Sequence, residues 1–225
     1  MMMMLLPWSL ILLVVVFQVV VSRWSLERES KRRWQHALTG HTLVQISYIL
    51  PFLWCVVSLT LASFGIIYLC FYQQDIYTKL FGSLLRPEES GGRSLPGAFY
   101  FLVGTCITLL LVPLPIARYA VACLSWADPM AAWVGRTIQT PMWTASASVA
   151  GSVACFGTAW TMGYTYLTLL DDENSTPISF WTISVGAFIC TIAEANGVWL
   201  FNDNLSIPIA TALAVHTHQK IVSQG

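Results

Sequence analysis

Long charge-free apolar runs alternate with short charged connections along almost the whole chain. The hydrocarbon core of a bilayer is about 30 Å thick, so an α-helix needs roughly 20 apolar residues to cross it. The longest runs meet that length and predict an all-α fold, a multi-pass transmembrane helical bundle with four to five spans. The expected spans cover approximately residues 5–22, 46–72, 97–117, 142–170 and 178–201.

Composition supports a single integral membrane domain over residues 1–225. Hydrophobic residues make up 56% of the chain and charged residues 10%, which leaves too little polar surface to cover a soluble globule of this size. Outside the spans we expect a basic juxtamembrane segment, 23–42, short loops and a polar tail, 202–225. The pattern therefore predicts no sizeable soluble domain, and the formal net charge of zero implies no nucleic-acid partner.

The first apolar segment can be interpreted as a signal peptide or as a retained span. Residues 1–4 contain no Lys or Arg, whereas the residues after the segment are strongly basic. Cleavage would leave that basic cluster on the translocated side of the membrane, against the positive-inside tendency. We therefore expect the segment to be retained, with the N-terminus outside and the basic segment inside.

The basic segment has the spacing of a short solvated helix, because Glu27 with Lys31 and Glu29 with Arg33 are separated by four residues. Such a cluster can contact anionic lipid headgroups. It can also act as a topology anchor alone, which we favour, or as an internal targeting signal like those of some mitochondrial inner-membrane proteins. The candidate headgroup-contact residues are Arg23, Arg28, Lys31, Arg32 and Arg33.

One face of the expected fourth span carries only small or hydroxylic residues, at alternating steps of three and four. Small residues mark helix interfaces in lipid because they let backbones approach each other. The spacing favours a left-handed crossing of about 20°. Alternatively, the threonines line a path for a solute or ion, although such threonines often bond to their own i−4 carbonyl. The candidate helix-packing interface comprises Thr144, Ala147, Gly151, Ala154, Thr158, Thr161, Thr165 and Thr168.

Glu194 is the carboxylate that falls inside an expected span. Ionisable groups are costly in a bilayer and mark candidate functional sites. We treat Glu194 as a candidate intramembrane charge site, with Arg118 as its candidate partner on the same predicted side. The functional interpretation is a proton or cation relay, and the simpler one is a carboxylate wetted at the membrane boundary. Pro113 and Pro115, just before Arg118, are expected to kink or end the third span.

The sequence shows no catalytic motif. It lacks G-x-S-x-G, H-E-x-x-H and a Gly-rich phosphate loop. Six cysteines fall singly without C-x-x-C spacing, and the four histidines lie outside the span centres, so neither a metal site nor a haem is predicted. A lipid-modifying enzyme would need a polar cluster at the membrane surface, and the acidic cluster 171–173 more simply ends a helix. We predict that the protein is not an enzyme and has no cofactor other than bound structural lipids.

These features together predict a non-catalytic accessory subunit of a larger membrane protein complex, such as a respiratory-chain or ATP-synthase assembly. It would dock through the small-residue face of the fourth span, and its partners would be other membrane subunits and membrane lipids. The alternative is a small oligomeric transporter or channel that uses the threonine face and Glu194. We expect an integral membrane location, with the mitochondrial inner membrane preferred over the endomembrane system and the plasma membrane. The chain shows no resemblance that identifies a family.

Overall fold

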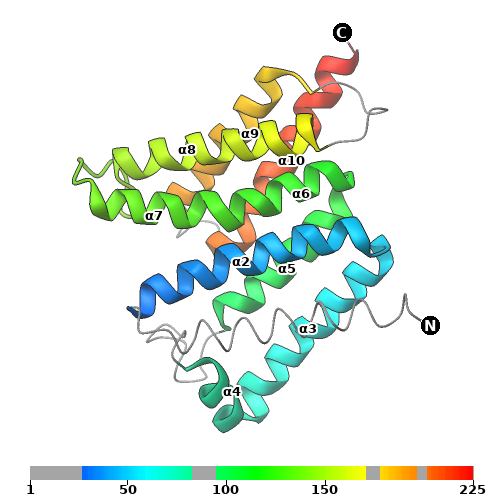
Figure 1. Ribbon diagram of the computed structural model, residues 1–225, viewed down its shortest axis with the longest axis vertical. Coiled ribbons are helices and arrows are strands. Elements are labelled where there is room, and N and C mark those ends of the chain that lie inside the picture. The colour runs from blue at the N-terminus through cyan, green and yellow to red at the C-terminus, as the bar shows by residue number, and fades with distance from the viewer. Residues whose placement is uncertain (1–26, 83–94, 171–177, 197–201, 225) are drawn as a thin grey trace. The chain divides into compact units, whose positions relative to one another are not determined.

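Helices make up the described part of the chain, which contains no β-strand (Figure 1). This confirms the predicted all-α class. The chain divides into two compact units, Met1–Val103 and Gly104–Gly225. The expected first span, 5–22, lies outside the described residues. The computed structural model describes residues 27–82, 95–170, 178–196 and 202–224.

In the first unit a proline divides the long apolar run into two helices. Helix α2 (Arg28–Ile49) ends before Pro51, and α3 (Phe52–Tyr72) begins after it. A proline disfavours the helical conformation of the residue before it, and Leu50 is accordingly extended, with φ −95° and ψ 143°. The predicted run from residue 46 therefore belongs to two helices.

Helix α2 contains most of the predicted basic segment. The Arg33 Nη2 atom lies 3.4 Å from Glu29 Oε1, which confirms the i,i+4 ion pair expected from the spacing. Of the candidate headgroup-contact residues, Arg23 lies outside the described residues and the other four lie on α2. The headgroup contact itself stays a prediction.

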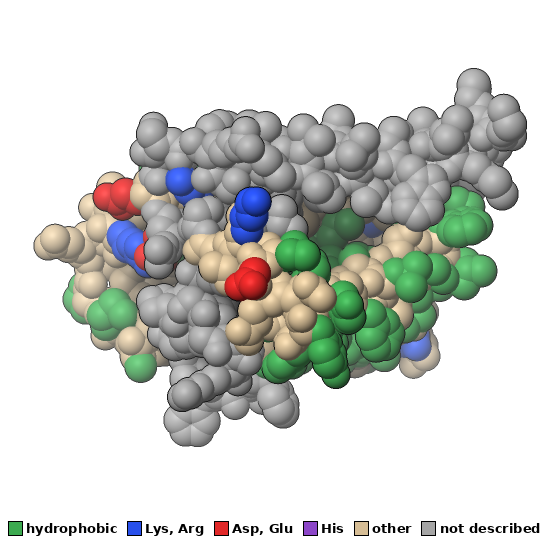
Figure 2. All heavy atoms as spheres, turned by 90° about the horizontal axis from the view of Figure 1, so that it is seen from below, with side chains coloured by type: hydrophobic (Ala, Val, Ile, Leu, Met, Phe, Trp, Pro, Cys, Tyr) green, Lys and Arg blue, Asp and Glu red, His purple; other side chains and the backbone are tan. Residues whose placement is uncertain are grey.

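Helix α3 is long and apolar enough to cross a membrane, and it is the one helix among the described residues that meets both criteria. Most of its side chains are exposed, so it is not a core helix of this unit. Figure 2 shows hydrophobic side chains gathered along α3, with charged side chains near the short helix α4 (Gln74–Phe81). Helix α5 (Gly97–Leu111) and α9 (Phe180–Ala195) are apolar but shorter.

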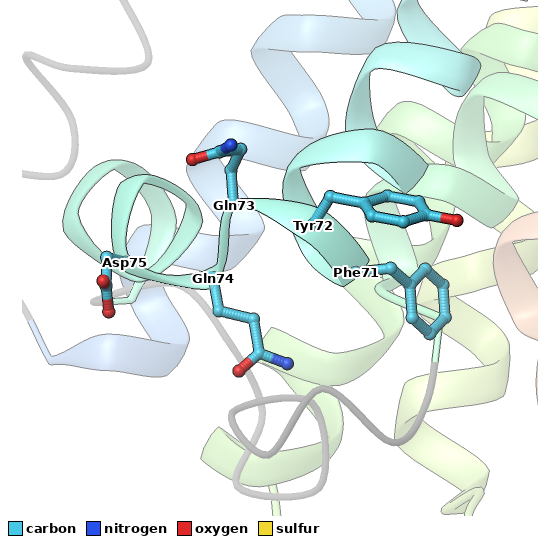
Figure 3. A pocket seen from close by; sticks show the side chains of 5 residues that line it. All are labelled: Phe71, Tyr72, Gln73, Gln74 and Asp75. Atoms are coloured by element: carbon cyan, nitrogen blue, oxygen red, sulfur yellow. The ribbon is translucent and has the colours of Figure 1, made fainter.

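A surface hollow lies where α3 turns into α4 (Figure 3). Five consecutive residues line it, and in Figure 3 their side chains splay away from the turn instead of converging on one point. The lining contains no basic side chain that could hold a phosphate group. The hollow is therefore a poor candidate for an anionic ligand. The lining residues are Phe71, Tyr72, Gln73, Gln74 and Asp75.

The second unit contains a long helical segment where the sequence predicted only a short loop between the spans 97–117 and 142–170. After α5 ends at Leu111, α6 (Leu114–Ala122), the π-helical turn η1 (Cys123–Ala127) and α7 (Asp128–Thr137) follow without interruption. Pro113 precedes α6 as its N-cap, which confirms the predicted end of the preceding helix. A proline in the first turn of a helix costs little because that N–H has no intrahelical partner.

The remaining helices pack as antiparallel neighbours. Helix α8 (Val149–Tyr164), with its π-helical extension η2 (Thr165–Leu169), packs against α7 and α9, and α9 packs against α10 (Asp203–Gln224). Residues 202–225 had been expected to form a polar tail. Instead, α10 buries one face against its neighbours, because Ile207, Thr211 and Val215 recur every four residues.

Tyr119 forms the centre of the second unit and is fully buried. Two glycines make room for its ring. A Cβ added at Gly186 would lie 2.9 Å from Tyr119 Cε1 and 2.6 Å from Val215 Cγ2, and one added at Gly163 would lie 2.6 Å from Ile183 Cγ2. The close approach of α6, α8, α9 and α10 therefore depends on residues without side chains.

Replacing Gly186 by alanine is expected to lower the free energy of unfolding by about 1–3 kcal/mol, because the new methyl group overpacks the Tyr119 site. Gly157→Ala is the matched control, since no atom lies within 4 Å of the added Cβ. Alanine there should be neutral or stabilise the helix by up to about 1 kcal/mol. Thermal unfolding in detergent, followed by tryptophan fluorescence, checks both. Equal melting temperatures of the two variants would contradict the close packing of Gly186 against the Tyr119 ring.

The residues that α8 buries differ from those of the predicted small-residue interface. Its buried members are Gly151, Cys155, Ala159 and Gly163. Thr144 and Ala147 precede α8 and lie in the loop before it. In the second half of the predicted face, three of the four threonine hydroxyls donate to the carbonyl four residues earlier; these are Thr161, Thr165 and Thr168.

Candidate functional site

Several chain segments meet at one end of the second unit. The C-terminal ends of α7 and α9 and the N-terminal ends of α8 and α10 all lie there, together with the loop 138–148 that joins α7 to α8 (Figure 1). In Figure 1 this loop is at the left tip of the α7–α8 pair. The end of the unit thus gathers residues that are far apart in sequence.

Glu194 occupies the last turn of α9 at this end. Its Oε2 atom is buried and has no hydrogen-bond partner among the described residues. Asp203, at the start of α10, is the charged residue that acts on the Glu194 carboxyl group. Two adjacent carboxylates, one of them desolvated, repel each other unless a proton or a cation compensates the charge. The pair is therefore an acidic site that favours the uptake of a proton or a cation.

The start of α10 is held close to its neighbours. The Oδ1 atoms of Asn202 and Asp203 both accept the Asn204 N–H, at 3.0 Å each. A Cβ added at Gly104 in α5 would lie 2.6 Å from the Asn204 carbonyl oxygen. This backbone contact fixes the position of the helix end that carries Asp203.

Asp128 is the first residue of α7 and directly follows η1. The turn η1 packs against both α9 and α10, the helices that carry Glu194 and Asp203. π-Helical turns are rare, and they frequently occur at functional sites. Asp128 is half-buried.

Positive charge is also available at this end. Arg136 lies exposed in the last turn of α7, just before the loop 138–148. The first N–H groups of α8 are already bonded, because Ala150 N–H donates to Thr140 Oγ1 at 2.9 Å and Gly151 N–H donates to Ser148 Oγ at 3.2 Å. The Arg136 guanidinium is therefore the candidate phosphate contact at this end.

Glu194 and Asp203 alone supply too few oxygen ligands to hold a divalent cation. Among the described residues, no group of three or more His, Cys, Asp or Glu side chains could hold a metal ion. Magnesium, however, is usually bound by one or two carboxylates together with phosphate oxygens. Glu194, with its unpartnered oxygen, and Asp203 fit that requirement if a nucleotide supplies the other oxygens.

The structure places Glu194 beside Asp203 instead of beside Arg118. Arg118 directly precedes Tyr119 on α6, and Tyr119 packs beside Gly186, two turns before Glu194 on α9. No ion pair between Glu194 and Arg118 occurs in the described part of the chain. The charged neighbour of Glu194 is therefore a different residue from the one expected.

Sequence reasoning missed Asp128, Asp203 and Arg136 as site residues. Asp128 and Arg136 fell between the expected spans 97–117 and 142–170, and Asp203 fell in the expected polar tail 202–225. The Asp128-Pro129 pair was an available signal, because proline favours the first turn of a helix. The run Asn202-Asp203-Asn204 was another, since these side chains favour helix N-termini.

The chain is similar to two curated fungal proteins. It is 31% identical over 150 residues to the CTP-dependent diacylglycerol kinase 1 of Schizosaccharomyces pombe, an alignment that covers 63% of this chain and 67% of the relative. It is 24% identical over 159 residues to the protein of the same name from Eremothecium gossypii, covering 63% of this chain and 50% of the relative. No family model and no solved structure matches the chain.

These relatives overturn the functional prediction from the sequence. Both are named as kinases, so the predictions of a non-catalytic accessory subunit, of no enzymatic activity and of subunit partners in a larger complex are wrong. The prediction of no cofactor did not anticipate the nucleotide CTP that both names specify. The transporter or channel alternative has no support from these relatives. The sequence contains none of the short catalytic motifs that we searched for, so an enzyme was not predicted.

The predicted integral membrane location agrees with the names of the relatives and with the structure. Diacylglycerol, the lipid that both names specify, resides in membranes, and α3 is long and apolar enough to cross one. The similarity to the Schizosaccharomyces pombe protein covers two thirds of that protein. The chain belongs to the family of CTP-dependent diacylglycerol kinases.

Proposed function

We propose that this chain transfers the γ-phosphoryl group of CTP to the free hydroxyl group of diacylglycerol and releases CDP. The observation that carries the proposal is the buried, unpartnered Oε2 atom of Glu194 beside Asp203. Two neighbouring carboxylates and a guanidinium suit a nucleoside triphosphate with its counter-ion. The names of the relatives supply the donor and the acceptor.

The reaction forms a bond between the lipid hydroxyl oxygen and the γ-phosphorus. The bond from that phosphorus to the oxygen that bridges to the β-phosphate breaks, and its electron pair leaves with CDP. The hydroxyl proton passes to a base, and Asp128 is the candidate for this role. Phosphoryl transfer depends mainly on positioning and charge stabilisation, with a carboxylate orienting the attacking hydroxyl group.

The other side chains hold the phosphates. Glu194 and Asp203 would bind a magnesium ion, which when present neutralises charge on the phosphate oxygens. Arg136 contributes a guanidinium, whose planar donors match phosphate oxygens. Since Glu194 Oε2 is shielded from solvent, water is partly excluded from the acidic pair.

The membrane arrangement is part of the proposal. Helix α3 is the strongest candidate span, and α5 and α9 are the shorter candidates. The four to five spans expected from the sequence would place the acidic end of α9 near a membrane surface. A diacylglycerol molecule presents its hydroxyl group at that depth, because the hydroxyl group is its polar end and its acyl chains stay in the hydrocarbon layer.

Arg136→Gln is expected to raise the KM for CTP about tenfold while kcat changes little, because a charge-assisted phosphate contact is lost. The matched control is Lys220→Gln. Lys220 lies on the same helix as Asp203, but about 25 Å further along it. Initial rates at varied CTP concentration check both variants. A KM for the Arg136 variant that equals the control's would remove Arg136 from the phosphate site.

The experiment that tests the proposed function measures CDP release by the purified chain in detergent micelles. We expect release from CTP only when diacylglycerol is present, and much slower release when ATP replaces CTP. Release that does not depend on the lipid would indicate nucleotide hydrolysis. Absence of release with either nucleotide would contradict the proposal.

A further inference from the structure

Two hydroxyl groups of the α7–α8 loop bind the end of the helix that carries Glu194. Thr144 Oγ1 donates to the Ala195 carbonyl oxygen at 3.1 Å, and Ser146 Oγ donates to the same oxygen at 3.0 Å. The last carbonyl groups of a helix have no intrahelical partner and need donors from elsewhere. Here the donors come from another part of the chain, and Ala195 is buried.

The loop that supplies these donors is itself well fixed. The Trp143 N–H donates to the Ala147 carbonyl at 3.1 Å, and the Ala147 N–H donates back to Thr144 Oγ1 at 2.9 Å. The Trp143 indole N–H donates to Ser152 Oγ at 2.8 Å, which ties the loop to the first turn of α8. The loop therefore provides a rigid attachment and not a flexible one.

Ala195 directly follows Glu194, so the position of this carbonyl group sets the position of the carboxylate-bearing turn. The next residue, Asn196, is the C-cap of α9, and its side chain donates to the Ile192 carbonyl at 2.9 Å. That cap is local to α9 and does not fix the helix end relative to α7 or α8. Thr144 and Ser146 are the described donors that do.

We propose that Thr144 and Ser146 are positioning residues, which hold the Glu194 carboxylate in register with the α7 side chains of the site. This inference rests on the proposed function for its effect on catalysis. The pair acts through the Ala195 backbone and does not itself touch a substrate. Removing such supporting contacts of a metal-binding carboxylate usually lowers metal affinity or activity by about 10- to 100-fold.

The test is the double variant Thr144→Val with Ser146→Ala. We expect kcat to fall by about 10- to 100-fold and the magnesium concentration for half-maximal activity to rise, while the KM for CTP changes less. Thr144→Ser should restore most of the activity in the Ser146→Ala background, because the hydroxyl donor returns. Thr161→Val with Ser223→Ala is the matched control, since both hydroxyls donate only within their own helices.

A second measurement separates this inference from the proposed function. Binding of Mn²⁺ alone, followed by electron paramagnetic resonance, needs no turnover. We expect the double variant to bind Mn²⁺ about tenfold more weakly than the wild type. If the wild type transfers no phosphoryl group but this difference is found, the proposed function fails and the positioning role stands. Equal Mn²⁺ affinity, or equal kcat and magnesium dependence in active protein, overturns the positioning role.

Discussion

Glu194→Gln is expected to lower kcat by about 1,000-fold or more. A neutral amide is a poorer ligand than a carboxylate for the magnesium ion that would neutralise the phosphate charge. The amide has nearly the same size as the carboxyl group, so the packing of α9 should persist. The substitution also removes the repulsion between Glu194 and Asp203. Thermal stability should therefore stay the same or rise, since an uncompensated buried charge is costly.

The measurement combines initial rates with melting temperatures for the wild type and the variant. Asp75→Asn on α4 is the matched control, because this exposed carboxylate lies in the other unit. We expect the control to retain wild-type kcat. A Glu194→Gln variant that keeps kcat within about threefold, a difference below 1 kcal/mol, would remove Glu194 from the site.

Asp128→Asn is expected to lower kcat by about 100- to 10,000-fold, the range of general base catalysis. The asparagine amide can still orient the lipid hydroxyl group but cannot take its proton. The KM for CTP should change by no more than about threefold, because Asp128 is assigned to the acceptor and Arg136 to the phosphates. This split between kcat and KM distinguishes the two roles.

The same steady-state kinetics check this assignment, with varied CTP at saturating diacylglycerol. Asp128→Glu serves as the conservative companion, since it keeps a carboxylate at a shifted position. We expect it to recover part of the lost rate. If the Asp128→Asn variant instead showed a raised KM for CTP with normal kcat, Asp128 would belong with the phosphate-binding residues.

The breaks between helices could be predicted from the sequence because single residues control them. Proline has no N–H and restricts the residue before it, so Pro113 marks an end that the structure reproduces, and Pro51 was an available signal for the break within the run 46–72. The Glu29–Arg33 pair follows equally directly from i,i+4 spacing. Local rules were sufficient for these features.

The helices at 114–137 and 203–224 could not be predicted from hydropathy. Their buried faces consist largely of small or hydroxylic residues such as Ala120, Ala127 and Thr211. These residues contribute little to an apolar pattern, yet they allow the close approach that the Tyr119 region shows. Close packing of small side chains therefore stabilises these two helical segments, and hydropathy alone does not reveal it.

The candidate site was recognised only at Glu194, because a carboxylate in an apolar run stands out alone. Its neighbours come from positions 128, 136 and 203, which ordinary polar loops could equally contain. Only the fold brings η1, which directly precedes Asp128, against α9 and α10, the helices that carry Glu194 and Asp203. A motif search could not detect residues that the tertiary structure assembles.

The most direct test of the central claim follows the γ-phosphate itself. The purified chain is incubated with diacylglycerol micelles, magnesium and CTP that carries radioactive phosphorus at the γ position, and the lipid is then extracted. We predict that the label appears in phosphorylated diacylglycerol, in an amount equal to the CDP released. Label recovered only as inorganic phosphate, or only as unreacted CTP, would contradict the assignment of this chain as a CTP-dependent lipid kinase.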